Sequence, residues 1–406
     1  MEKVVNHPRK AASSNTKRVN LALQGGGAHG AFIWGVLDYL LEDRRLEIAA
    51  ISGTSAGAMN AVALADGFTA GGLEGARAKL EGFWRAMSDG AKNSPIKRAP
   101  IDVMMGYRNL DRSMGYHMMD AMSRMFSPYQ LNPMNMNPLK DVLNSCVDFS
   151  CVQSCTSIDL FISATNVETG KVRVFDGKKL TSDMVMASAC LPNLFQAVMI
   201  DNVPYWDGGY MGNPALFPFH SGSDTADIIV VQINPIERKG APRTAQEIQN
   251  RVNEISFNSS LLKELRAIDF VARLIEEGKL DPAQYRHERI HVIENQSALM
   301  KMGASSKMNA EWEFLTHLRD LGRASAADWL DRHFNDMGER ATVDLRAAAT
   351  LTLALPKRDL SDPGIRDAVG DLYLADISVP PQPYEELTWP MVVPPFAAGD
   401  VLRLDD

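Results

Sequence analysis

Long apolar runs are absent from this chain of 406 residues. A helix that spans a membrane needs about 20 consecutive apolar residues, and no uninterrupted run approaches that length. Basic residues are outnumbered, because 42 Lys and Arg stand against 50 Asp and Glu and give a formal net charge of −8. This balance argues against general affinity for nucleic acid and does not favour strong attraction to anionic membranes. The composition, 45% hydrophobic and 23% charged, is that of an ordinary soluble globular protein.

Cysteine is scarce as well. The four cysteines are Cys146, Cys151, Cys155 and Cys190. They form no C-x-x-C pair and are accompanied by no His-x-x-x-His spacing, so we expect no structural zinc and interpret them as small buried residues of a reducing, cytoplasmic protein. The first residues are polar and basic without an apolar segment, so we interpret 1–17 as a disordered basic tail and not as a secretory signal.

The stretch around which the chain is organised is Gly53-Thr54-Ser55-Ala56-Gly57, which reads G-x-S-x-G. An apolar run precedes it and a helix-compatible run of small residues follows it, so Ser55 stands at the apex of a strand–turn–helix unit. Such a turn strains its middle residue and requires small neighbours two positions to either side. The following helix directs its partly positive N-terminus at the serine. Taken alone, the motif also fits a plain tight turn.

A glycine-rich turn lies upstream, Gly25-Gly26-Gly27-Ala28-His29-Gly30, between an expected strand at 18–23 and a helical pattern at 31–41. Its glycines match the G-x-G-x-x-G dinucleotide fingerprint, but exposed N–H groups in such a turn can also form an oxyanion hole. Dinucleotide binding expects an acidic residue at the end of the next strand. That strand instead ends in Ser52-Gly53 and enters the serine turn, which favours the oxyanion hole.

Together with two downstream segments, these motifs resemble the patatin-like phospholipase family over about the first half of the chain. The segment Ser188-Ala189-Cys190-Leu191-Pro192-Asn193-Leu194-Phe195 is similar to the family's S-x-A-x-P-x-x-F. The segment Trp206-Asp207-Gly208-Gly209-Tyr210, followed by Asn213-Pro214, is similar to its D-G-G/A motif. Two positions depart from the family pattern: Gln24 stands where members often have Asp, and His29 stands where many have Arg or Lys.

The resemblance implies a Ser–Asp dyad in place of a Ser-His-Asp triad. Ser55 would attack an ester carbonyl and Asp207 would take its proton, without a metal or cofactor. The expected oxyanion donors are the amides of Gly25, Gly26, Gly27, Ala28 and Ala56. The glycines expected to support the motifs are Gly30, Gly53, Gly57, Gly208 and Gly209.

The implied fold is a three-layer α/β/α domain with a mainly parallel central sheet, and the implied activity is hydrolysis of carboxylic esters of lipids. We place the catalytic domain at 18–235, a mostly helical part packed on the same core at 236–345, and a Pro-rich acidic tail or arm at 346–406. The substrate stays open among phospholipids, acylglycerols, acyl thioesters and hydroxyalkanoate oligoesters. We expect a cytoplasmic protein that binds no nucleic acid; peripheral contact with a membrane or lipid surface and the oligomeric state stay open.

Residues 93–137 hold several prolines and a run of methionines: Met104, Met105, Met114, Met118, Met119, Met122, Met125, Met134 and Met136. Methionine is flexible and polarizable and suits surfaces that adapt to varied acyl chains. We therefore expect a mobile cap that receives the acyl chain. The alternative is a second core layer, because Met118, Met122 and Met125 have helical spacing.

Two rival interpretations keep the serine turn but change its role. An α/β-hydrolase triad would need a histidine after the acid, and the histidines that follow Asp207 are His220, His287, His291, His317 and His333. A nucleotide- or lipid-binding module would leave Ser55 inert. Labelling by an organophosphonate that modifies activated serines separates this second rival from an enzyme.

Overall fold

A computed structural model of the protein describes residues 16–345, apart from the side chain of Ser221. The expected tail or arm at 346–406 lies outside the described residues, as does nearly all of the expected tail at 1–17. Within the described part, no helix is both long enough and apolar enough to cross a lipid bilayer.

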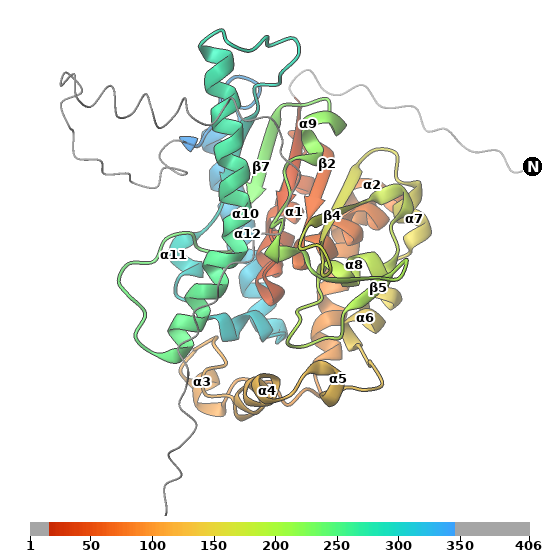
Figure 1. Ribbon diagram of the computed structural model, residues 1–406, viewed down its shortest axis with the longest axis vertical. Coiled ribbons are helices and arrows are strands. Elements are labelled where there is room, and N and C mark those ends of the chain that lie inside the picture. The colour runs from red at the N-terminus through yellow and green to blue at the C-terminus, as the bar shows by residue number, and fades with distance from the viewer. Residues whose placement is uncertain (1–15, 346–406) are drawn as a thin grey trace, which may run out of the picture. The chain divides into compact units, whose positions relative to one another are not determined.

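An eight-stranded sheet forms the centre of the described chain, in the order β5-β6-β3-β2-β1-β7-β8, with β4 paired to β3 (Figure 1). The strands are β1 (Lys17–Leu23), β2 (Leu46–Gly53), β3 (Asp159–Asn166), β4 (Val172–Asp176), β5 (Val198–Ile200), β6 (Val203–Asp207), β7 (Asp227–Val231) and β8 (Arg289–Ile293). The strands from β3 to β8 along this order run parallel, whereas β4, β5 and β6 pair antiparallel. The expected α/β fold with a mainly parallel sheet is confirmed.

Helices connect the strands and cover both faces of the sheet. The α-helices are α1 (Gly30–Asp43), α2 (Ala56–Gly90), α3 (Pro100–Met104), α4 (Met114–Met125), α5 (Pro128–Leu131), α6 (Pro138–Cys146), α7 (Phe149–Ser154), α8 (Ser182–Ser188), α9 (Pro218–Gly222), α10 (Ala245–Glu276), α11 (Gln296–Leu299) and α12 (Trp312–His333). Short 3₁₀ turns are η1 (Gly27–His29), η2 (Gly177–Lys179), η3 (Gly208–Tyr210) and η4 (Ala304–Met308).

Alternation along the strands gives the sheet two buried faces. In β1, Leu21 and Leu23 join the core that contains α1, α2 and α12, whereas Ala22 joins the core that contains α10. Successive side chains of a strand point to opposite faces, so an apolar run in β1 contributes to both layers of helices. On the second face, Leu261 and Leu265 of α10 are buried against the sheet. The arrangement is helix, sheet, helix (Figure 1).

Helix α12, from the C-terminal half of the described chain, packs directly on α1. Two glycines make this contact possible. A Cβ added at Gly35 would lie 1.9 Å from the carbonyl oxygen of Arg319, and one added at Gly322 would lie 2.0 Å from that of Phe32. These distances are far below van der Waals contact, so only glycine allows the two helix backbones to approach this closely.

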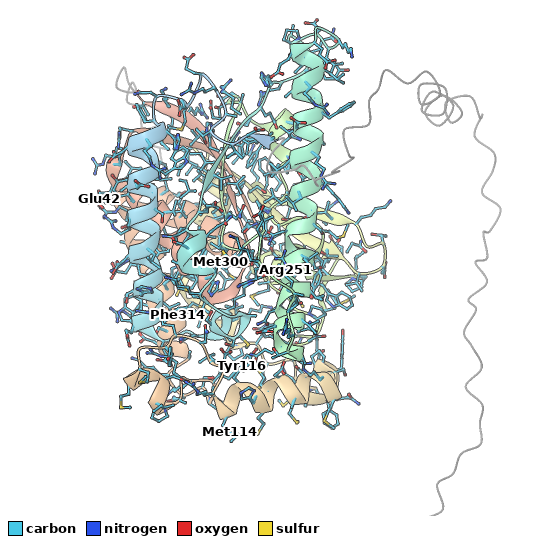
Figure 2. All side chains as sticks on the ribbon, turned by 90° about the vertical axis from the view of Figure 1, so that its left-hand side faces the viewer. Glu42, Met114, Tyr116, Arg251, Met300 and Phe314 are labelled. Atoms are coloured by element: carbon cyan, nitrogen blue, oxygen red, sulfur yellow. The ribbon has the colours of Figure 1, made fainter. Side chains whose placement is uncertain are left out.

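The Met-rich segment lies away from the core. Helices α3, α4 and α5 follow one another along the same edge of the domain, and Figure 2 shows Met114 on the side of α4 that faces away from the sheet. No residue of α4 is buried. Met118, Met122 and Met125 are 62%, 39% and 75% exposed. The alternative of a second core layer is therefore wrong, because these side chains face solvent.

Candidate active site

Ser55 stands at the sharp turn between β2 and α2. Its backbone has φ 53° and ψ −117°, a strained conformation that non-glycine residues rarely adopt. Its N–H donates to Ser188 Oγ at 2.9 Å. Close packing requires the flanking glycines, because a Cβ at Gly57 would lie 2.2 Å from Leu23 O and one at Gly53 would lie 2.8 Å from the Gly57 carbonyl. The strained turn therefore requires glycine at both positions.

Asp207 stands where β6 ends and η3 begins. Its N–H donates to the carbonyl oxygen of Cys190 at 2.8 Å, and its Oδ1 accepts from Gly209 N–H at 2.7 Å. The residue is 1% exposed. A Cβ at Gly208 would lie 2.1 Å from Ser163 O, so the chain can turn beside β3 only with glycine there. These contacts hold the carboxyl group in one orientation within the domain.

The other carboxyl oxygen, Asp207 Oδ2, is buried and has no hydrogen-bond partner among the described residues. Burial raises the pKa of Asp207 to about 7. The Gly209 N–H, the Ser55 hydroxyl and, last, Lys307 act in the opposite direction and lower that pKa. A Cβ added at Gly208 would also lie 3.1 Å from Thr54 Cγ2, so the turn that carries Asp207 packs against the turn that carries Ser55. A carboxylate with a pKa near neutrality and an unoccupied oxygen suits a general base.

The glycine-rich turn lies directly against the serine. A Cβ added at Gly25 would lie 2.7 Å from the Cβ of Ser55. The Gly25 N–H donates to Asn213 Oδ1 at 2.6 Å, so this predicted oxyanion donor is already engaged. The other predicted donors have no acceptor in the described part of the chain: the N–H groups of Gly26, Gly27, Ala28 and Ala56.

Comparison with known proteins identifies the domain that carries this geometry. Residues 21–220 match the family model described as patatin-like phospholipase. These residues form a patatin-like phospholipase domain. The family that the motifs predicted is thereby confirmed for residues 21–220, and the family implies a lipid hydrolase. No curated protein matches the sequence.

Several solved structures are similar to the chain at low identity. VipD from Legionella pneumophila is 16% identical with a TM-score of 0.39, and the match covers 79% of this chain and 68% of VipD. The type III effector ExoU is 15% identical with a TM-score of 0.29, and the match covers 78% of this chain and 53% of ExoU. The ExoU–SpcU complex of the Pseudomonas aeruginosa type III secretion system gives 13% identity, a TM-score of 0.32, and coverage of 79% and 52%. The chain thus spans about half of the ExoU chain, and these likenesses say nothing of its activity.

Gln24, the first departure from the pattern of the patatin-like domain, is a fully buried and fully bonded amide. Its Oε1 accepts from the backbone N–H groups of Ile233 and Asn234 at 2.9 and 3.0 Å. Its Nε2 donates to Asn258 Oδ1 at 3.2 Å and to the carbonyl oxygen of Asn213 at 3.4 Å. A carboxylate can only accept hydrogen bonds, so an amide fits this position, which requires a donor on one side.

His29, the second departure, is buried and neutral. Its Nε2 lies 2.7 Å from Ser306 Oγ. Burial, together with the nearby cations Lys307 and Arg238, lowers the pKa of His29 to about 3. His29 therefore contributes no positive charge to the patatin-like domain at neutral pH.

Three of the five histidines considered for a triad contact acidic residues away from Ser55. His220 contacts Glu288 at 2.6 Å, His291 contacts Asp227 at 3.0 Å and His333 contacts Asp336 at 2.9 Å. No hydrogen bond in residues 16–345 joins a histidine to Ser55. Over the same residues, no group of three or more His, Cys, Asp and Glu side chains is placed to hold a metal ion.

Three contacts at this site were not predicted from the sequence. Ser188 and Asn213 belong to the downstream motifs, but nothing in their spacing indicates that they hold the Ser55 and Gly25 amides. Lys307 lies outside the patatin-like domain and gives no motif signal. The Gly25 N–H is buried and a buried N–H is usually paired, but only the fold shows that Asn213 supplies the acceptor.

Proposed function

We propose that this protein is a lipid acyl hydrolase that cleaves carboxylic esters through an acyl-enzyme on Ser55. The observation that supports this most is the buried Asp207 carboxyl group, whose Oδ2 is unpartnered beside the Ser55 hydroxyl. Membership of the patatin-like family supports a lipid substrate. Buried polar atoms are rarely left without a partner, and an open carboxyl oxygen on the motif that the family resemblance singles out is free to accept a proton.

In the proposed reaction, Ser55 Oγ bonds to the ester carbonyl carbon while its proton passes to Asp207 Oδ2. The carbonyl oxygen becomes an oxyanion bound by free amides of the glycine-rich turn and the start of α2. Collapse breaks the bond to the alcohol, which leaves with the proton from Asp207. Water then attacks the acyl group, its proton passes to Asp207, and Ser55 recovers that proton as the fatty acid leaves.

The test of this function combines labelling and hydrolysis. We expect a fluorophosphonate to label Ser55 of the full chain stoichiometrically, and p-nitrophenyl esters and phospholipid vesicles to be hydrolysed. Mass spectrometry of the labelled peptide identifies the residue. A chain that is neither labelled nor hydrolytic would be a binding module instead. Hydrolysis of thioesters or hydroxyalkanoate oligoesters in preference to lipids would keep the mechanism but change the substrate.

We further propose that α3–α5 form a cap that receives acyl chains and contacts the lipid surface, with the protein acting peripherally from the cytoplasm. Two hydrogen bonds at the ends of the segment support this proposal. At one end, the Leu110 N–H donates at 3.1 Å to the Oγ of Ser305. Ser305 belongs to η4, which contacts the glycine-rich turn. At the other end, Gln196 Nε2 donates to Asn132 O at 2.7 Å. Between these two hydrogen bonds lies α4, whose apolar side chains are exposed.

Replacing Met114, Met118 and Met125 together with glutamine is expected to lower hydrolysis of vesicles and long-chain esters by about tenfold or more, because buried methionine surface contributes ~1 kcal/mol or more per side chain to lipid contact. Short-chain, water-soluble esters should be hydrolysed at the wild-type rate. The matched control replaces the same three residues with leucine and should retain vesicle activity. Equal losses on short and long substrates would contradict a cap that contacts acyl chains.

A further inference from the structure

A segment outside the patatin-like domain forms part of the wall behind the glycine-rich turn. The turn η4 lies against η1, where Ser306 Oγ contacts His29 Nε2 at 2.7 Å. A Cβ added at Gly27 would lie 2.4 Å from the carbonyl oxygen of Lys307, so the two backbones are in direct contact. Residue 307 is therefore fixed relative to the amides proposed to bind the oxyanion.

The side chain of Lys307 is a cation without an ion pair. Its Nζ donates to Asn234 Oδ1 at 2.6 Å, and no carboxylate of residues 16–345 lies within salt-bridge distance. An ammonium has three N–H donors, so it can donate further. Asn234 in turn donates through Nδ2 to the carbonyl oxygen of Gly25 at 2.7 Å. A chain of two hydrogen bonds thus connects the ammonium to the glycine-rich turn.

The charged groups around Lys307 leave this corner of the site positive. Glu254 of α10 is a negative charge that acts on Lys307. Both of its carboxylate oxygens, however, already accept hydrogen bonds from Arg238, and its Oε2 lies 3.3 Å from Arg251 Nη1. Burial lowers the pKa of Lys307 to about 8. The negative charges of Glu254 and Asp207 raise this pKa, whereas the positive charge of Arg238 lowers it. His29 on η1 is neutral. At pH 7 the half-buried Lys307 is therefore a cation that interacts with the dyad carboxylate.

We propose that Lys307 is a positioning residue for ester hydrolysis: its ammonium stabilises the negative charge that develops on the oxyanion at the glycine-rich turn. This inference rests on the proposed function. The free amides carry only partial positive charges. A full positive charge held in place in a water-poor site adds to their stabilisation of the oxyanion, and it does not have to reorient during the reaction. Because Asn234 links the ammonium to Gly25, the charge also holds the turn in place. The activity of the patatin-like domain then depends on a residue 87 positions beyond residue 220, where that domain ends.

The test replaces Lys307 with methionine and, separately, with arginine in the full chain. For Lys307→Met we expect kcat on a neutral p-nitrophenyl ester to fall by about 10- to 100-fold, with KM changed less than about threefold, because the charge acts on the transition state. Wild-type activity should rise with pH as Asp207 ionises near pH 7 and fall as Lys307 loses its proton near pH 8. In Lys307→Arg the alkaline fall should disappear, because a guanidinium stays charged.

The matched control is Lys301→Met, which removes an exposed lysine from the preceding loop and should keep both wild-type kcat and the alkaline fall. A Lys307→Met chain with wild-type kcat and an unchanged pH profile would overturn the role of Lys307 while leaving the dyad intact. If Lys307→Met does not fold, an alkaline fall that persists in Lys307→Arg would overturn it equally. A wild-type chain that is neither labelled nor hydrolytic overturns the proposed function itself, and the role of Lys307 with it.

Discussion

Replacing Ser55 with alanine is expected to abolish ester hydrolysis and fluorophosphonate labelling, with kcat falling by about 10⁴-fold or more. The loss should be this large because the variant removes the hydroxyl that acts on Asp207 and is proposed to attack the ester carbonyl, and water cannot occupy the same fixed position. The fold should survive. The bond from the residue 55 N–H to Ser188 Oγ is made by the backbone, and the Cβ that contacts Gly25 remains in alanine.

The measurement is kcat with a p-nitrophenyl ester, together with intact mass after labelling and the thermal unfolding midpoint. Ser145→Ala is the matched control, because Ser145 is an exposed serine in α6 and its loss should change none of the three. If the Ser55→Ala chain kept more than about 1% of wild-type activity, the nucleophile would have to be another group. Labelling that persisted in this variant would identify that group directly.

The parts of the site that are local in sequence could be predicted from the sequence. The strand, turn and helix around Ser55 follow from an apolar run, a pair of glycines and a run of small residues that are contiguous in the sequence. The same holds for the glycine-rich turn between β1 and α1. The role of Asp207 came from family resemblance and not from spacing, because an Asp-Gly-Gly sequence by itself is most simply a turn.

The contacts that cross the fold could not be predicted from residue patterns. Asn213 reaches the Gly25 N–H across 188 positions, and Lys307 reaches Asn234 across 73. Such partners depend on which loops meet at the carboxyl ends of the parallel strands, and no periodicity encodes that. The helical spacing of the methionines in α4 correctly predicts that they share one face of a helix. It does not predict whether that face meets solvent or a core, because both cases have the same period.

Replacing Asp207 with asparagine is expected to abolish hydrolysis and, at the same time, to stabilise the fold above neutral pH. Activity should fall by about 10³-fold or more, because an amide cannot accept the Ser55 proton. The asparagine Oδ1 can still accept from Gly209 N–H, so the turn at η3 stays formed. The variant removes a buried carboxylate, which is costly to keep ionised without a full set of hydrogen bonds.

The sign of the stability change follows from the pKa of Asp207, which burial raises from 3.8 to about 7 in the folded state. Between these values the folded chain binds more protons at this site than the unfolded chain, so wild-type stability falls as pH rises. Asp207→Asn should match wild type near pH 4 and exceed it by a few kcal/mol above pH 7, measured as the free energy of unfolding in urea. Asp227→Asn is the control with the opposite expected sign. Burial raises the pKa of Asp227, but hydrogen bonds from His291 and Arg289 outweigh burial and lower that pKa. Loss of this carboxylate should therefore destabilise the fold, most of all above pH 4. An Asp207→Asn chain less stable than wild type at pH 8 would mean that the carboxylate is satisfied in the folded protein, and it would not then be a base held ready for the Ser55 proton.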